Sequence, residues 1–315
     1  MTVITDNEAG QRLDRYLRKR YTGLSLGEIY KLIRKGIVKV NGKKSKEDYR
    51  LKAEDIVEIP DIEQEEKEAF FNVPYNIAVV YEDENIIIVD KPAGLLVHPD
   101  KSEKKHTLIN QVLAYLYQKG EYDPKSLSTF TPALCHRLDR NTSGLIIIAK
   151  TYPALQTMTA LIRQKRLRKF YLCLVEGKIT KPGIIELRLQ KDDEKNQVRV
   201  TKEGLTAVTN YLPIEVVNGY TLLEVEIVTG RTHQIRVHMA SIGHPLAGDL
   251  KYGKKIDNQK FYKNYGLKRQ FLHAYKLIVE AKETSLFYLD GKHFQSELPE
   301  DLKKTLLVLE KRNLV

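Results

Sequence analysis

The sequence of 315 residues is poor in cysteine and in long apolar runs. Its two cysteines, Cys135 and Cys173, have no metal-type spacing and do not suggest a disulfide scaffold, so a reduced compartment is the simplest interpretation. No run approaches the ~20 apolar residues that a membrane helix needs. The N-terminus also lacks the basic-then-apolar layout of a signal peptide. We therefore expect a cytoplasmic protein with no membrane partner.

The common motifs for metals and nucleotides are missing as well. The sequence has no glycine-rich phosphate loop and no dinucleotide fingerprint. His233, His238 and His244 are separated by five and six positions, which matches no common metal site, and no nearby cysteine or pair of acids completes one. We therefore expect neither a metal ion nor a small-molecule cofactor.

What the sequence has in excess is positive charge. It contains 52 Lys and Arg against 41 Asp and Glu, which gives a formal net charge of +11 at pH 7. This excess favours a polyanionic partner, nucleic acid first and an anionic membrane surface second. The hydrophobic content of 42% is ordinary for a globular protein, and the length suffices for one large domain and a small one.

Residues 11–59 have the pattern of a small basic domain, with two helices followed by short strands. Leu13 and Leu17 share one face of the first helix. Ser25 and Glu28 have the spacing of a capping box at the start of the second helix. An Asn-Gly pair further on predicts a tight turn between strands.

Basic side chains cluster on both of these helices and on the turn. Residues 11–59 contain 14 Lys and Arg against 7 Asp and Glu. The order of elements resembles the αL RNA-binding domain of a small-subunit ribosomal protein. Arg34, Lys35 and Lys43 are candidates for phosphate contacts, which attract RNA without reading its bases. The alternative is a charged surface that serves only solvation.

Composition also suggests where the domains divide. Residues 61–68 are acidic and polar, as exposed linkers are. We predict an RNA-binding domain over residues 1–60, a linker over 61–75 and a catalytic domain over 76–315.

Residues 135–150 join a polar loop to an apolar run. The run from Leu145 to Ala149 is typical of a strand buried on both faces. In the loop before it, Asp139 lies between Arg137 and Arg140. Flanking guanidinium groups favour the ionised carboxylate, which suits a nucleophile or a general base. A turn or N-capping aspartate in a surface salt bridge is the alternative.

Hydrophobic periodicity gives a coarse outline of the remaining chain. It predicts a hairpin of two strands, two helices and further strands over the second half. These elements fall at residues 77–81 and 86–89 for the hairpin, 107–119 and 153–165 for the helices, and 171–175 and 183–228 for the later strands.

The stretch HRLDRNTSGLIIIAK, residues 136–150, resembles the signature of the RluA-type pseudouridine synthases. Residues 168–177 are similar to the tyrosine block of this family, and residues 229–249 to its arginine block. The similarity continues through residues 270–274 and covers most of 76–300. It implies an α+β catalytic domain on a mixed, largely antiparallel sheet, an activity without cofactor, and the isomerisation of uridine to pseudouridine in RNA.

The resemblance also implies roles for individual residues. Asp139 would be the nucleophile, Arg236 its ion-pair partner, and Tyr171 the ring that stacks on the base and assists proton transfer. Arg137 would fill the gap left by a flipped base, and Leu272 would line the pocket. The remaining candidates for RNA contact are His136, Arg140, Lys169, Arg231, His233 and Gln234.

Several of these assignments have plainer alternatives. Arg236 could be a structural arginine in a strand, and Tyr171 a core aromatic of its strand. Asp249 is a second acid whose plain role is a turn. His136 and His233 are better suited to orienting loops than to transferring protons.

The similarity is greatest to the RluC/RluD branch, which modifies a few separate uridines in large-subunit (23S) ribosomal RNA. We therefore expect a monomeric synthase whose partner is that RNA. Three alternatives remain: a transfer RNA synthase, a non-catalytic RNA-binding or ribosome-assembly factor, and an RNA glycosidase that releases free base. A glycosidase would normally use two carboxylates, and only one stands out here.

Overall fold

The computed structural model describes residues 1–21, 23–60, 73–124, 130–192 and 197–313. Its first part, residues 1–60, is called the N-terminal unit below, and residues 73–313 the large unit. Most of the predicted linker, residues 61–75, lies outside the described residues. The division into domains at this linker therefore stays a prediction.

The N-terminal unit combines two helices with a four-stranded antiparallel sheet in the order β1-β4-β2-β3. Leu13, Tyr16 and Leu17 from the first helix meet Ile29 and Ile33 from the second in one buried cluster. The elements are β1 (Thr2–Val3), α1 (Leu13–Arg20), α2 (Leu26–Arg34), β2 (Lys39–Val40), β3 (Lys43–Lys44) and β4 (Ile56–Glu58).

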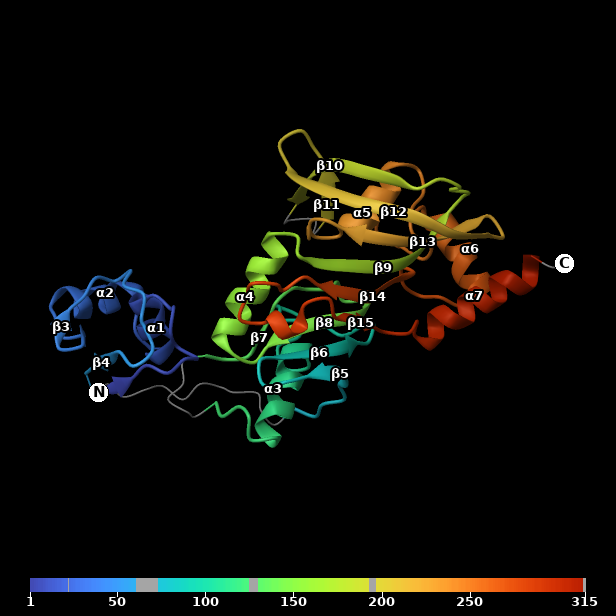
Figure 1. The fold of residues 1–315 in the computed structure, drawn as a ribbon. Coiled ribbons are helices and arrows are strands. Elements are labelled where there is room, and N and C mark those ends of the chain that lie inside the picture. The colour runs from blue at the N-terminus through green and yellow to red at the C-terminus, as the bar shows by residue number, and fades with distance from the viewer. Residues whose placement is uncertain (22, 61–72, 125–129, 193–196, 314–315) are drawn as a thin grey trace.

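Local sequence explains where these elements begin and turn. The predicted capping box is confirmed, because the Ser25 hydroxyl accepts from the Glu28 N–H and the Glu28 carboxylate accepts from the Ser25 N–H at 2.8 Å. Asn41 and Gly42 both have positive φ, as a tight turn between β2 and β3 requires. The N-terminal unit touches the large unit where the Lys19 ammonium lies 5.9 Å from the centre of the Tyr152 ring. Figure 1 shows the N-terminal unit in blue, to one side of the large unit.

The large unit is built on an 11-stranded sheet in which every strand pair except β14 and β8 is antiparallel. The predicted mixed, largely antiparallel sheet of an α+β fold is therefore confirmed. Nine strands follow one path: β11 (Gln197–Val200), β10 (Gly183–Asp192), β12 (Leu205–Val217), β13 (Tyr220–Ile227), β9 (Leu167–Glu176), β14 (Leu272–Val279), β8 (Ser143–Ala149), β6 (Ile86–Lys91) and β5 (Ala78–Glu82). Off this path, β15 (His293–Gln295) pairs with β14, and β7 (Ala133–Leu134) with β8.

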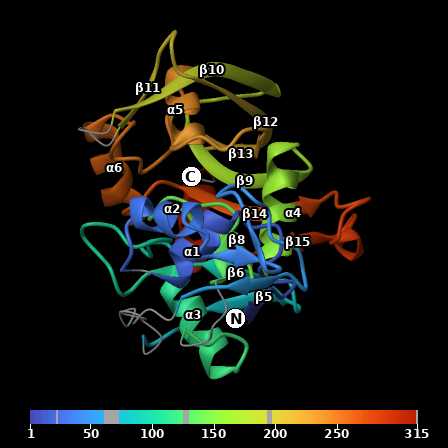
Figure 2. The same ribbon diagram turned by 90° about the vertical axis from the view of Figure 1, so that its left-hand side faces the viewer.

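Helices cover both faces of this sheet (Figure 2). On one face, α3 (Leu108–Gln118) and α5 (Gln234–Ser241) pack with Ile146, Ile148 and Tyr171. On the other, α4 (Tyr152–Arg163) packs with Leu145 and Ile147. Strand β8 is thus buried on both faces, as its apolar run predicts. The remaining helices are α6 (Lys255–Tyr265), α7 (Glu300–Asn313) and a short 3-10 turn, Phe287–Leu289.

Strand β14 joins two halves of the sheet. It pairs with β9 on one side and, in parallel, with β8 on the other. At Gly144 the strands approach so closely that a Cβ would lie 2.2 Å from the Ala274 carbonyl oxygen. Only glycine fits there, and its φ of 115° is in a region that other residues rarely adopt. This close approach fixes the loop that precedes β8.

Candidate active site

The loop of residues 139–142, at the start of β8, is held by buried cations. The fully buried Lys91 ammonium donates to the Arg140 carbonyl at 3.0 Å, and the Gly94 N–H donates to the same oxygen at 2.8 Å. The Arg269 guanidinium donates to the Asn141 carbonyl at 3.1 Å. Asp139 is therefore presented by a loop whose backbone is fixed on both sides.

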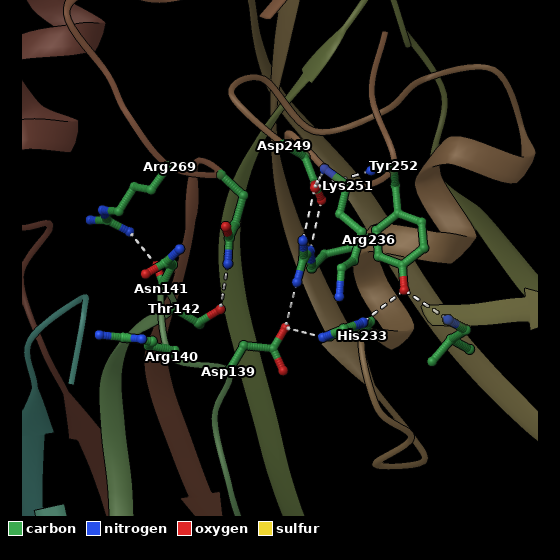
Figure 3. A network of polar contacts seen from close by, with 12 residues as sticks. Asp139, Arg140, Asn141, Thr142, His233, Arg236, Asp249, Lys251, Tyr252 and Arg269 are labelled. Carbon is green, nitrogen blue, oxygen red and sulfur yellow. Dashed lines mark hydrogen bonds and ion pairs between the residues drawn. The ribbon is translucent and has the colours of Figure 1, made fainter. Parts of the chain in front are cut away.

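Asp139 shares an arginine with a second acid (Figure 3). Arg236 donates to Asp139 Oδ2 through one nitrogen, at 3.1 Å, and to both oxygens of Asp249 through its other two, at 2.7 and 2.8 Å. Burial lowers the pKa of Arg236, but the two carboxylates more than compensate and hold that pKa above its ordinary value. Asp139 Oδ1 has no hydrogen-bond partner among the described residues.

Two features of this arrangement differ from the plainer interpretations. Arg236 lies on helix α5, so the interpretation as a strand arginine is wrong. Ile235 and Val237 suggest a strand, but α5 is buried on nearly all sides against the sheet, which hides its helical period. Asp249 does make a turn, accepting from the N–H groups of Lys251 and Tyr252. Its fully buried carboxylate also orients Arg236, a role that the sequence did not reveal.

His233 contacts the other side of the same carboxylate. Its Nε2 lies 3.7 Å from Asp139 Oδ2, and its Nδ1 lies 2.7 Å from the Tyr252 hydroxyl. Because the Tyr252 oxygen already accepts from the Val198 N–H, its own proton goes to Nδ1 and leaves the imidazole proton on Nε2, facing Asp139. Burial lowers the pKa of His233 to about 4, so the ring is neutral at pH 7. His233 thus helps to orient the Asp139 carboxylate and adds no positive charge to the site.

A cavity of about 250 Å³ opens beside Asp139. Tyr171 lies in its wall with Leu272, as the resemblance implies. Burial and the Asp139 carboxylate raise the pKa of Tyr171, so its hydroxyl is protonated at neutral pH. A buried ring, an apolar wall and a carboxylate with one free oxygen can hold a planar base next to a nucleophile or a general base.

The structure sorts the predicted RNA contacts into two groups. Arg137, Arg140 and Arg231 are exposed near the cavity, and Arg34, Lys35 and Lys43 are exposed on the N-terminal unit, so all six guanidinium and ammonium groups can reach RNA. By contrast, His136, Lys169, His233, Gln234 and Leu272 line the cavity and are largely shielded from solvent.

Gln234 is a special case within the second group. Its side-chain oxygen accepts from Thr229 and from the Arg231 N–H, and its nitrogen donates to Val208 and Thr209. With these bonds made inside the protein, the amide shapes the turn before α5.

No group of three potential metal ligands is found among the described residues. Of the three histidines weighed as ligands, His233 bonds to Tyr252 and His244 Nδ1 lies 2.7 Å from the Glu176 carbonyl oxygen. In the part of the chain that the structure describes, no helix is both long and apolar enough to cross a bilayer.

The fold and the site are those of an enzyme that presents an ionised carboxylate, held by an arginine, to a cavity with an aromatic wall. Comparison with known proteins gives the family. A model described as RNA pseudouridylate synthase matches residues 85–241, and an S4 domain model matches residues 11–57. Ribosomal large subunit pseudouridine synthase C of Pasteurella multocida (strain Pm70) is 33% identical over 330 residues, which cover 99% of this chain and 94% of that protein. The chain belongs to the RNA pseudouridylate synthase family and is a pseudouridine synthase.

Two further comparisons agree. The protein of the same name from Escherichia coli (strain K12) is 36% identical over 288 residues, covering 87% of this chain and 86% of its own. The solved structure of Human RNA Pseudouridylate Synthase Domain Containing 4 shares the fold, with a TM-score of 0.58 and 23% identity over 74% of this chain and 92% of that one.

Proposed function

We propose that this synthase converts more than one uridine of large-subunit ribosomal RNA to pseudouridine, with Asp139 as the nucleophile. One observation carries the assignment of the site. Arg236 holds one oxygen of Asp139, while the other has no partner among the described residues, and Asp139 lines the same cavity as Tyr171. The names of the curated relatives support the RNA class.

The reaction needs one bond broken and one made. The base leaves its sugar at N1, turns over in the cavity and rejoins the sugar through C5, while the proton lost from C5 is balanced by one gained at N1. The step is redox-neutral. Asp139 attacks the uridine and forms a transient bond, which breaks again before the product leaves. Arg236 stabilises the carboxylate as an anion, and the protonated Tyr171 stacks on the base and can relay the proton.

A uridine inside a stem must leave its stack to reach this cavity. We propose that Arg137, exposed at the cavity, fills the gap that it leaves. The N-terminal unit, residues 1–60, would hold neighbouring phosphates, joined through the linker 61–75 to the catalytic residues 76–315. We further propose that the protein works as a monomer in the cytoplasm.

The test is a map of pseudouridines in ribosomal and transfer RNA from cells with and without the gene. We expect two or more pseudouridines to disappear from large-subunit ribosomal RNA. Wild-type protein should restore them, and so should Asp290→Asn, a matched change of an exposed aspartate outside the cavity, whereas Asp139→Asn should not. Loss confined to transfer RNA would contradict the substrate assignment, and loss at a single ribosomal site would contradict the claim of several targets.

A further inference from the structure

One side of the cavity contains a buried ammonium group that the reaction described above does not use. Lys169 lies two residues before Tyr171 on β9, and both line the cavity. Lys169 is only 6% exposed. A Cβ placed on Gly230, another residue of the cavity wall, would lie 3.5 Å from Lys169 Nζ. Among the described residues, Nζ has neither a hydrogen bond nor an ion pair.

A second donor without a partner lines the same cavity. His136 Nε2 accepts from the Ile147 N–H at 3.2 Å, so the neutral ring carries its proton on Nδ1. Nδ1 is buried and has no partner in the described part of the chain. Burial, with the nearby charge of Lys169, lowers the pKa of His136 to about 3, which agrees with a neutral ring.

A buried donor without an acceptor, as at His136 Nδ1, and an ammonium that meets only the cavity, as at Lys169, are both unfavourable for the folded protein alone. The cost to the charged form is visible at Lys169, because burial lowers the pKa of its ammonium to about 8. Groups of this kind persist where a ligand completes them. The missing partner must offer oxygen acceptors, and it must fit beside the apolar side chains of Ile162, Ile227 and Leu272.

We infer that Lys169, beside the His136 ring in the same cavity wall, forms a subsite for a carbonyl oxygen of the flipped uracil. The inference rests on the proposed function and adds the group that recognises the base. A carbonyl fits better than a phosphate. Phosphates of the RNA can bind to the exposed Arg137 and Arg231, whereas Lys169 is buried. If the oxygen is O4, the subsite also rejects cytosine, whose 4-amino group would meet the Lys169 ammonium, another donor.

The first test compares Lys169→Met, which keeps the length of the side chain, with Lys178→Met, an exposed lysine just beyond the same strand. With large-subunit ribosomal RNA transcript at saturation, Lys169→Met should lower the single-turnover rate by about 10- to 100-fold. Its RNA affinity and the salt dependence of binding should match those of Lys178→Met. Its melting temperature should rise, because an unpaired buried charge is removed.

Other results would overturn the inference. A smaller salt slope with weaker RNA binding would assign Lys169 to a phosphate. If Lys169→Met keeps the wild-type rate and melts at a lower temperature, the role of Lys169 is structural. If it keeps the rate and melts at a higher temperature, Lys169 contacts only water and not the base. If wild-type protein forms no pseudouridine in any RNA, the proposed function fails first.

The second test identifies the oxygen. The probe is a stem-loop around a uridine found by the mapping experiment, with that uridine replaced by 4-thiouridine or by 2-thiouridine, since sulfur is a weaker acceptor. The substitution at the contacted position should slow the wild type at least fivefold more than it slows Lys169→Met. Equal slowing of both proteins by both thio-uridines would contradict a carbonyl contact.

Discussion

The N-terminal unit and the large unit use lysine and arginine in opposite ways. In the N-terminal unit, Arg34, Lys35 and Lys43 are exposed and have no partner among the described residues. In the large unit, Lys91 and Arg236 are buried and hold named oxygens. Exposed cations attract any phosphate and are screened by salt, whereas buried cations fix geometry and are not. The large unit thus combines buried cations that fix the site with exposed arginines at the cavity, whereas these three cations of the N-terminal unit are all exposed.

The two units also differ in how they respond to acid. Residues 1–60 contain no histidine, and all eight lie further along the chain. Three of these, His136, His233 and His238, are neutral because burial lowers their pKa values to about 3, 4 and 4.

The largest effect is expected from Asp139→Asn. The amide keeps the shape and can still accept from Arg236, but it is a poor nucleophile, so turnover should fall roughly 10⁴-fold. RNA affinity, which we assign to exposed cations, should change by less than a few-fold. Single-turnover kinetics and filter binding measure the two separately. Near-normal turnover would sink the assignment of the nucleophile.

Acid should destabilise the large unit before the N-terminal unit. The three histidines have pKa values in the folded state below the unfolded value of about 6.5, so the unfolded chain binds more protons below that pH. Stability should fall as pH drops through 6.5 and continue to fall until about pH 4. At about 1.4 kcal/mol per histidine and pH unit, the loss by pH 5.5 is at most roughly 4 kcal/mol.

The N-terminal unit supplies the internal control for this prediction. Burial raises the pKa of Asp55, but hydrogen bonds from the Lys52 N–H, Asn41 and Tyr49 outweigh it and lower that pKa. A carboxylate with a lowered pKa loses its stabilising effect only as pH falls toward and below about 4. Hydrogen exchange resolved by peptide, corrected for the intrinsic rate, should show the large unit opening first. Simultaneous opening of both units would contradict the prediction.

Arg236→Lys should lower turnover by about 100-fold while the protein stays folded. An ammonium can neutralise Asp249 but cannot span both carboxylates as the three donor atoms of Arg236 do. Arg236→Ala should also destabilise the protein by about 3–5 kcal/mol, because it leaves Asp249 buried without its ion pair. Turnover and chemical denaturation of both variants separate the two effects. Full activity of Arg236→Lys would refute the requirement for a fork of donors.

The smallest effect is expected when Arg34, Lys35 and Lys43 are all changed to Gln. RNA affinity should fall about tenfold at physiological salt, and the slope of log affinity against log salt should decrease by about 2 to 3. The rate at saturating RNA should not change, since these residues lie outside the cavity. A matched triple change of the exposed Lys178, Lys181 and Lys282 controls for net charge. An unchanged slope would show that the N-terminal unit does not bind phosphates.

The sequence allowed the local elements and the central aspartate to be predicted, because each depends on neighbouring residues. The capping box of Ser25 and Glu28 and the doubly buried run at 145–149 are of this kind. Among partners from distant segments, the pair of Arg236 and Asp139, 97 residues apart, was predicted through the resemblance, and the others were not. Asp249 binds Arg236 across a turn, and Lys91 fixes the Arg140 carbonyl from 49 residues away. Neither contact produces a periodic pattern in the sequence. A helix that is buried on nearly all sides, such as α5, has no hydrophobic periodicity to reveal it.

The position of β14 has a consequence for the order of events during synthesis. Strands β5–β8 and strands β9–β13 are separate halves of the sheet, and in the described structure β14 is the strand that pairs with both. It is made after the two halves, so a ribosome must translate past residue 279 before Asp139 on one half can meet Arg236, whose helix follows the other. A nascent chain stalled before that point would expose the edges of β8 and β9 and lack the assembled pair. The two halves of the sheet therefore depend on a strand that is made after both, and β15, which pairs with β14, follows it.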